Sequence, residues 1–129
     1  MTAFSEFITF CATTDLEATS RFYGEILGLP LVLDQGRCRI WLAAGHGYIG
    51  FCRRDSVSTQ GVILTLVSEH VDEWYQRLKE GGVTVEKAPA FNPEYGIYHL
   101  FCRDPSGYLV EIQRFEDPAW NKGSTADAR

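Results

Sequence analysis

The segment YLVEIQRF, residues 108–115, follows the pattern of YIGFC, residues 48–52, but has a glutamate where the earlier segment has a glycine. When the two segments are aligned, Gly50 stands opposite Glu111. The same series precedes each of them: an apolar run, a helical stretch ended by glycine, and further short apolar runs. We therefore predict two copies of one βαβββ unit, in which residues that differ at matched positions bear on function.

The first copy, module one, spans about residues 6–53. Residues 6–12 are β-branched and aromatic, as expected for a buried strand. Thr14 and Glu17 have the T-x-x-E spacing of a capping box, which predicts the start of a helix. Gly28 is expected to end that helix in a left-handed turn. Short strands are predicted at about 31–34, 37–43 and 47–52.

A polar stretch, residues 54–60, is predicted to link this unit to module two, about residues 61–115. Asp104-Pro105-Ser106-Gly107 has the composition of a type I turn. Residues 119–129 are mostly small and polar, so we expect a flexible tail. The elements predicted for module two are a strand at 61–67, a helix at about 69–80, and strands at 83–87, 97–103 and 108–114, with a loop at 88–96.

The composition is that of a single globular domain of 129 residues, with 45% apolar and 22% charged residues. The net charge of −5 disfavours a nucleic-acid partner, because binding to phosphates requires clustered Lys and Arg. No apolar run approaches the ~20 residues of a membrane helix, and no basic, apolar leader is evident. We therefore expect a cytoplasmic protein with neither a membrane nor a nucleic acid as its partner.

The four cysteines, at positions 11, 38, 52 and 102, lie in or at the ends of apolar strand segments. A free cysteine in such a segment behaves as a small buried hydrophobe. The sequence has no C-x-x-C pair, so the cysteine spacing does not support a zinc site. We expect these side chains to pack in the core, and a pocket-lining thiol is the alternative.

Two longer motifs indicate a family. Module one contains D-L-E-x-x-x-x-F-Y-x-x-x-L-G-L from Asp15, and module two contains D-P-x-G-Y-x-x-E from Asp104. With two βαβββ modules, the chain resembles the vicinal oxygen chelate superfamily of glyoxalase I, extradiol dioxygenases, fosfomycin-resistance enzymes and bleomycin-binding proteins. The resemblance covers about residues 6–115. It implies an α+β fold whose modules form a cup, a half-barrel of mixed sheet with helices on the convex face, and it implies a homodimer.

The resemblance also implies four metal-ligand positions, on the first and last strand of each module, where metal-binding relatives typically have His and Glu. In this sequence the positions of module one fall at Ile8 and Gly50, and those of module two at Val62 or Ile63 and at Glu111. Transition metals generally need at least three imidazole or carboxylate donors from the protein. We therefore expect no bound metal and no other cofactor, with a divalent metal as the less favoured alternative.

Strand alternation gives the residues expected to line the cup. On the last strand of module two, Glu111 and Gln113 share one face. Gly50 shares a face with Tyr48 in module one, where it either makes room for a ligand or permits close approach of another group. Phe10 is expected to point inward from the first strand.

The register of two further strands stays open. Either Arg39 and Trp41 or Cys38 and Ile40 face the cup; a guanidinium and an indole suit an anionic or planar ligand. In module two, one pairing of the last hairpin places Tyr98 on the face of Glu111, and a slip of one residue places His99 there instead. The predicted ligand-binding residues are Phe10, Arg39, Trp41, Tyr48, Gly50, Tyr98, His99, Glu111 and Gln113.

The candidate catalytic residue is Glu111, because an inward carboxylate can act as a general acid or base. It can also form a structural pair with Arg39 or a tyrosine, or ligate a metal. The favoured hypothesis is a protein that binds a small aromatic or amphipathic molecule without a complete metal site. The alternatives are a lyase, isomerase or dioxygenase of the same superfamily that uses Glu111, and an interaction module whose strand edges mediate dimerisation.

Overall fold

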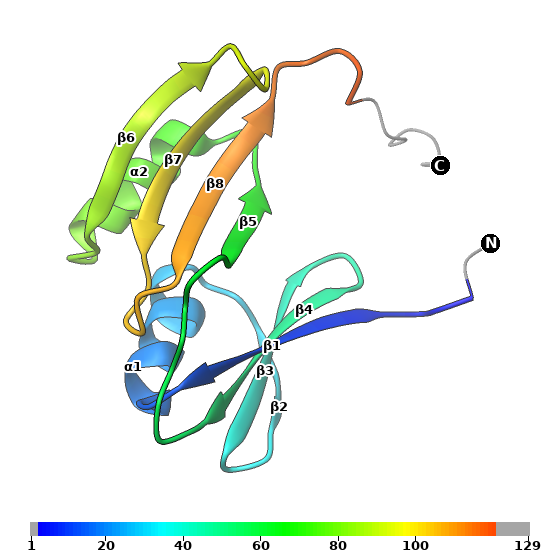
Figure 1. Ribbon diagram of the computed structural model, residues 1–129, viewed down its shortest axis with the longest axis vertical. Coiled ribbons are helices and arrows are strands. Elements are labelled where there is room, and N and C mark those ends of the chain that lie inside the picture. Colours follow the sequence, from blue (N-terminus) through cyan, green and yellow to red (C-terminus); the bar gives the residue numbers. More distant parts are fainter. Residues whose placement is uncertain (1–2, 121–129) are drawn as a thin grey trace. The chain divides into compact units, whose positions relative to one another are not determined.

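The computed structural model describes residues 3–120 and contains two four-stranded sheets, each with its own helical segment (Figure 1). The predicted α+β class and the two βαβββ units are confirmed. The strands lie in the order β1-β4-β3-β2 in one sheet and β5-β8-β7-β6 in the other. The elements are β1 (Phe7–Thr13), α1 (Leu16–Ser20), a π-helix η1 (Arg21–Ile26), β2 (Leu31–Asp34), β3 (Cys38–Ala44), β4 (Gly47–Arg53), β5 (Ile63–Val67), α2 (Val71–Glu80), β6 (Val85–Asn92), β7 (Ile97–Arg103) and β8 (Leu109–Phe115).

The described chain divides into two compact units. The first contains residues up to 62 together with 103–109, and the second contains residues 63–102 and those from 110 onward. The turn between β7 and β8 therefore belongs to the first unit, although the sequence places it in module two. Each unit is described below by itself.

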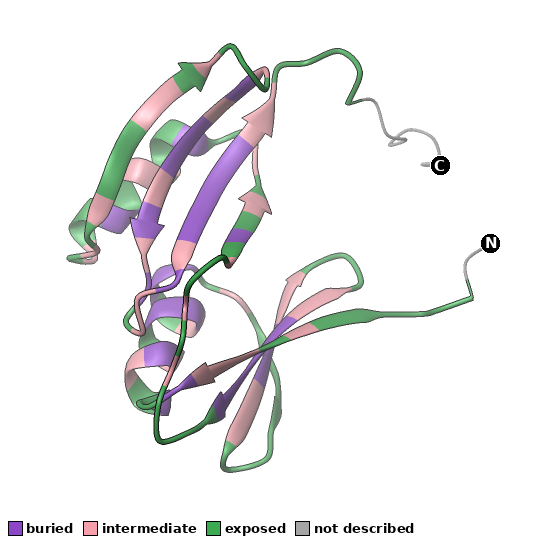
Figure 2. Ribbon diagram, in the orientation of Figure 1, coloured by how far each residue is buried: buried purple, intermediate pink, exposed green. Residues whose placement is uncertain are grey.

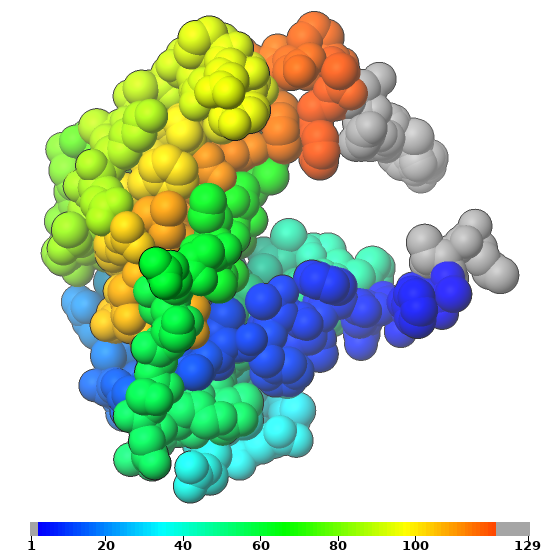
Figure 3. Space-filling model, in the orientation of Figure 1, coloured from blue at the N-terminus to red at the C-terminus, as the bar shows by residue number. Residues whose placement is uncertain are grey.

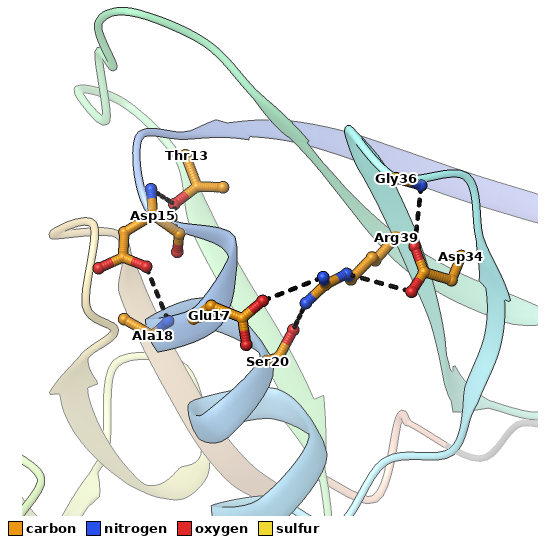
Figure 4. A network of polar contacts seen from close by, with 8 residues as sticks. All are labelled: Thr13, Asp15, Glu17, Ala18, Ser20, Asp34, Gly36 and Arg39. Carbon is orange, nitrogen blue, oxygen red and sulfur yellow. Dashed lines mark hydrogen bonds and ion pairs between the residues drawn. The ribbon is translucent and has the colours of Figure 1, made fainter.

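The first helix begins one residue later than the capping-box motif predicts. Asp15 is the N-cap, and its Oδ1 accepts a hydrogen bond from the backbone N–H of Ala18 at 3.0 Å (Figure 4). The prediction that Thr14 caps the helix is therefore wrong. Asp15 is a strong cap residue that satisfies an orphan amide of the first turn, and Glu17 forms an ion pair with Arg39 at 3.1 Å instead of folding back.

A π-helical turn, η1, continues the α1 helix. The backbone N–H of Leu27 donates to the carbonyl of Phe22 at 2.9 Å, a five-residue spacing typical of a π-turn. Phe22 and Tyr23 are both buried. The predicted end of the helix is confirmed at Gly28, whose positive φ of 72° is a conformation that glycine adopts at low cost.

The first sheet packs one face against this helical segment. β3 and β4 pair so that Trp41 lies opposite Ile49, and alternation places Phe51 on the same face. The ring of Tyr23 lies 4.8 Å from that of Phe51 and 6.1 Å from that of Trp41, centroid to centroid. Trp41 is only 1% exposed, so this aromatic cluster forms the core of the first unit.

The turn at residues 103–109 is held in the first unit by a buried carboxylate, Asp104. Tyr23 donates to its Oδ2 at 2.8 Å, and the backbone N–H groups of Ser106 and Tyr108 donate to its Oδ1, each at 2.9 Å. Burial raises the pKa of Asp104 above its ordinary value, while these hydrogen bonds act in the opposite direction. The Tyr108 hydroxyl in turn donates to the carbonyl of Ala12 in β1 at 3.0 Å.

In the second unit, α2 lies against one face of the sheet (Figure 1). Alternation along β7 and β8 sends one set of apolar side chains towards this face. β6 differs from prediction, because it continues through the segment expected to be a loop, as far as Asn92. Pro89 is accommodated because β6 is an edge strand, where a missing N–H breaks no ladder. The buried core residues of this unit are Leu64, Val71, Leu78, Ile97, Leu100, Cys102, Val110 and Ile112.

The described chain ends beyond β8 in ordered contacts. The ring of Trp120 stacks on Phe115 with centroids 4.0 Å apart. Most of the predicted flexible tail, residues 121–129, lies outside the described residues. Within residues 3–120, no helix is both long and apolar enough to span a membrane.

Replacing Tyr23 by Phe removes the buried donor to Asp104 and is expected to lower the free energy of unfolding by about 2 kcal/mol at about pH 7. The hydrogen bond from Tyr23 stabilises the ionised form of Asp104. Its loss in Tyr23→Phe therefore raises the pKa of Asp104 further. The loss of stability should therefore be smaller at about pH 3, where the carboxyl is protonated. Urea denaturation at both pH values measures this.

The matched control is Tyr95→Phe, because Tyr95 is exposed. It should leave the unfolding midpoint unchanged. An equal loss for Tyr23→Phe at both pH values would show that the hydrogen bond to Asp104 is not the source of the effect.

Candidate functional site

The nine predicted ligand-binding residues fall into three groups. Phe10, Tyr48 and Gly50 share the face of the first sheet that lies away from its helix, as the parallel pairing of β1 with β4 shows. His99, Glu111 and Gln113 lie together in the second sheet. Arg39, Trp41 and Tyr98 lie on the helix-facing sides of their sheets.

The group in the first sheet is arranged around the missing side chain of Gly50. Phe10 is the register partner of Gly50, and a Cβ at position 50 would lie 2.6 Å from Cε1 of the Phe10 ring. Ile40 also lies close, with Cγ1 at 3.4 Å from the same point. Of the two interpretations of Gly50, close approach is the one seen: the glycine lets an aromatic ring lie directly over the strand.

This face carries apolar side chains that the first unit does not bury. Phe10 is 57% exposed and Ile8 is 39% exposed. The first half of β1 is coloured as exposed in Figure 2, and the atoms of β1 lie uncovered at the surface of the unit in Figure 3. Ile8 pairs with Tyr48, whose hydroxyl donates to Glu6 Oε2 at 3.2 Å. The face is therefore apolar with a polar margin.

The open register of β3 is settled in favour of Cys38 and Ile40, which lie on the Gly50 face. The expectation that Arg39 and Trp41 line this face is therefore wrong. Trp41 is in the aromatic core. Arg39 crosses to the helix, where it donates to Ser20 Oγ at 2.7 Å and lies 3.1 Å from Glu17 and 3.5 Å from Asp34 (Figure 4).

The group in the second sheet is centred on the buried carboxylate of Glu111. Thr65 Oγ1 donates to its Oε1 at 2.8 Å, and His99 Nδ1 lies 2.6 Å from its Oε2. With its amide nitrogen turned towards the carboxylate, Gln113 donates to both oxygens at 3.0 and 3.1 Å. Two neighbouring strands, β5 and β7, and its own strand β8 thus supply hydrogen bonds that replace the water lost by this carboxylate on folding.

His99 is the second member of this site. In the tautomer with its proton on Nδ1, His99 donates to Glu111 and presents a lone pair at Nε2. The Nε2 atom is buried and has no hydrogen-bond partner among residues 3–120, and the residue is only 3% exposed. The ring of Phe101 contacts it edge-on at 5.0 Å. A carboxylate that orients an imidazole with a free nitrogen is an arrangement suited to proton transfer.

The open register of β7 is settled in favour of His99, so the placement of Tyr98 on the Glu111 face is wrong. The Tyr98 hydroxyl donates to Asp72 at 2.6 Å, at the start of α2. Thr65 was not predicted as a site residue. A hydroxyl within the otherwise apolar run GVILTLV was the sequence signal for it.

The donors expected by resemblance for a metal ion do not fit one. Ile8 and Ile63 have hydrocarbon side chains, Gly50 has none, and the carboxylate of Glu111 is engaged by three neighbours. No three His, Cys, Asp or Glu side chains converge within residues 3–120. A divalent transition metal needs more donors than either sheet offers, so no step of the chemistry below involves a metal.

The cysteines depart in part from expectation. Cys38 and Cys52, direct register partners on β3 and β4, form a disulfide. The expectation that all four cysteines are unbonded packed thiols is therefore wrong for this pair. The register of β3 and β4 places Cys38 opposite Cys52, and the spacing of the cysteines in the sequence does not reveal this pairing. Cys102 is buried and Cys11 is partly exposed, and neither is part of a disulfide.

A protein-family model for the Glyoxalase/Bleomycin resistance protein/Dioxygenase superfamily matches residues 8–112. The chain belongs to this superfamily. No curated protein matches the chain.

Solved structures share the fold at low sequence identity. A glyoxalase/bleomycin resistance protein/dioxygenase from Nocardioides is 18% identical, with 92% of this chain and 87% of that chain covered and a TM-score of 0.74. A lactoylglutathione lyase from Agrobacterium tumefaciens is 23% identical, with 89% and 95% covered and a TM-score of 0.72. TioX from Micromonospora sp. ML1 is 23% identical, with 85% and 98% covered and a TM-score of 0.72. At these identities the likeness shows the fold.

We predict that the purified protein carries no stoichiometric transition metal, because only one of the four expected ligand positions has a donor side chain. Elemental analysis by mass spectrometry after dialysis against mixed divalent metals measures this. One bound ion per chain that disappears in Glu111→Ala would contradict the prediction.

Proposed function

We propose that this protein binds a small, largely apolar organic molecule, aromatic or amphipathic, without a complete metal site. The observation that carries the proposal is the exposed apolar face of the first sheet, where the Phe10 ring lies over Gly50. Exposed aromatic and aliphatic side chains with a polar margin are typical of surfaces that bind a partner or a ligand.

Three features of this face favour a planar ligand. The Phe10 ring is large and more than half exposed, so it offers a surface for stacking. Gly50 leaves the strand behind it flat, and Ile8 adds an aliphatic neighbour. The Tyr48 hydroxyl, held by Glu6, provides a polar group at the margin of the same face. An amphipathic molecule matches this combination of groups.

The family supports the same class of function. The superfamily description names bleomycin resistance proteins beside glyoxalases and dioxygenases. In this chain three of the four positions that the resemblance implies for metal ligands are filled by residues without a donor side chain, and only Glu111 has one. Binding without metal chemistry therefore agrees with the side chains of the first sheet better than the metal-dependent reactions do.

Titration with the amphipathic aromatic dye 8-anilinonaphthalene-1-sulfonate is expected to show saturable binding to one site. Phe10→Ser should weaken binding about tenfold, because it removes most of one stacked aromatic surface. Compounds that displace the dye should raise the melting temperature of the wild-type protein.

Phe91→Ser is the matched control. Phe91 is an aromatic residue of similar exposure, 55%, on β6 of the other sheet. It should leave dye affinity unchanged. Equal weakening by both substitutions, or binding that does not saturate, would contradict a ligand site at Phe10.

A second candidate function is supported by one specific observation, the unpartnered Nε2 of His99 beside Glu111. In this alternative the protein is an enzyme that moves a proton on its substrate. His99 Nε2 takes the proton from the substrate, and Glu111 orients the ring and stabilises the imidazolium that forms. Thr65 and Gln113 hold the carboxylate in place.

Deuterium exchange into compounds found by dye displacement tests the second candidate. Incubation with the wild-type protein in D2O should introduce deuterium at a carbon of the substrate. The rate of labelling is measured by NMR. His99→Gln and Glu111→Gln should each slow labelling by about a hundredfold or more. Tyr98→Phe, next in sequence but on the opposite face, is the control and should retain the wild-type rate. Equal rates in His99→Gln and wild type would contradict the role of His99.

A further inference from the structure

We propose that the Cys38–Cys52 disulfide is a thiol-exchange site, at which a small anionic thiol becomes joined to Cys52 in an open pocket of the first unit. The proposal does not rest on the proposed binding function. It concerns a different chemical group, the disulfide, which lies on the same face of the first sheet as Phe10.

The pocket lies beside the disulfide and is formed within the first unit. It has a volume of about 230 Å³ and is lined by Phe10, Cys11, Ala12, Cys52 and Arg54. This volume accommodates a molecule of a few non-hydrogen atoms. Cys52 lines the pocket and Cys38 does not, so a molecule held in the pocket lies beside Cys52, although Cys52 is only 8% exposed and Cys38 is the more exposed of the two.

Charge selects the kind of thiol. Arg54 lines the pocket and is exposed, and its guanidinium donates to the carbonyl of Arg53 at 3.0 Å with one nitrogen. A guanidinium has five N–H donors, so others remain for an incoming anion. No carboxylate is among the lining residues. A thiol with a carboxylate or sulfonate group therefore fits the pocket better than a cationic thiol.

The reaction is a thiol–disulfide exchange. The thiolate sulfur of the small molecule attacks Sγ of Cys52, the bond between Cys52 and Cys38 breaks, and its electron pair leaves with Cys38 as a thiolate. The product is a mixed disulfide at Cys52. A second molecule of thiol attacks the sulfur of the first, which releases Cys52 as a thiolate. Two protons complete the two cysteine thiols, and the small thiol ends as its own disulfide.

Neither of the two cysteines outside the disulfide, Cys11 and Cys102, replaces the external thiol. Burial, and to a lesser extent the charge of Asp104, raise the pKa of Cys11 to about 11. Cys11 is therefore a protonated thiol near neutral pH, and the thiolate is the form that attacks a disulfide. Cys102 is fully buried in the other unit.

Opening the disulfide leaves the strands paired. β3 and β4 are held by an antiparallel ladder that extends from Cys38 and Cys52 to Ala44 and Gly47. Close to the disulfide, the N–H of Arg53 donates to the carbonyl of Arg37 at 2.7 Å, and the N–H of Gln35 donates to Cys38 at 2.8 Å. Exchange therefore occurs in the folded protein and changes the surface next to Phe10 without unfolding the sheet.

The experiment uses the oxidised full-length protein with two thiols, anionic 2-sulfanylethanesulfonate and cationic 2-aminoethanethiol, at equal thiolate concentrations. Samples are quenched with acid over time, and intact mass with peptide mapping gives the rate of opening and the modified residue. We expect the anionic thiol to open the disulfide about fivefold faster, a preference typical of one nearby exposed charge. The adduct should map to Cys52.

Variants test whether the charge of Arg54, and not that of the adjacent Arg53, sets the preference for an anionic thiol. Arg54→Gln should abolish the preference for the anionic thiol, and Arg54→Lys should keep it. Arg53→Gln is the matched control, because Arg53 is adjacent but does not line the pocket. In Cys38→Ser, which cannot expel the adduct, the symmetrical disulfide of 2-sulfanylethanesulfonate should give a lasting adduct at Cys52.

Three results would overturn the proposal. They are adducts that form on Cys38 in the wild-type protein, equal rates for the two thiols, and a disulfide that opens only when denaturant unfolds the chain. Loss of dye binding in Phe10→Ser has no bearing on these outcomes, so the two proposals fail separately.

Discussion

A buried carboxylate, Asp104, is the constraint on which the first unit depends. Its two oxygens are satisfied by the phenol of Tyr23 and by two amides of its own turn, so helix and turn must both be in place. A carboxylate buried without these donors would cost several kcal/mol. The interaction joins residues 81 positions apart in the sequence. It explains why the turn between β7 and β8 belongs to the first unit rather than to the module that encodes it.

Strand alternation then decides the chemistry of each sheet. Side chains that point towards the helix form the aromatic core in the first sheet and the aliphatic core in the second. Side chains on the other face do not pack against the helix, and they differ between the two units. The first sheet has an aromatic ring over a glycine. The second has a glutamate that accepts hydrogen bonds from three strands. The two units have the same order of strands and helix. Single side chains make the corresponding faces of their sheets chemically distinct.

The fold was largely predictable, because apolar periodicity and glycine turns report local structure directly. The bounds of β2 and β7 agree with prediction to the residue. The site was predictable only in part. Gly50 and Glu111 followed from aligning the copies, whereas the choice between Tyr98 and His99 depends on a one-residue register that hydrophobicity does not reveal when both neighbours are aromatic. The disulfide depends on pairing between strands, which no local pattern contains, and the role of Thr65 had only a hydroxyl in an apolar run as its local signal.

The contact between Phe10 and Gly50 also restricts the order in which substitutions at positions 10 and 50 can be accepted in evolution. Any side chain introduced at position 50 meets the aromatic ring within 2.6 Å. A carboxylate there is compatible with the sheet only after the residue at position 10 becomes smaller or the ring swings out to solvent. The two positions are therefore epistatic, and a path to a larger side chain at position 50 begins at Phe10.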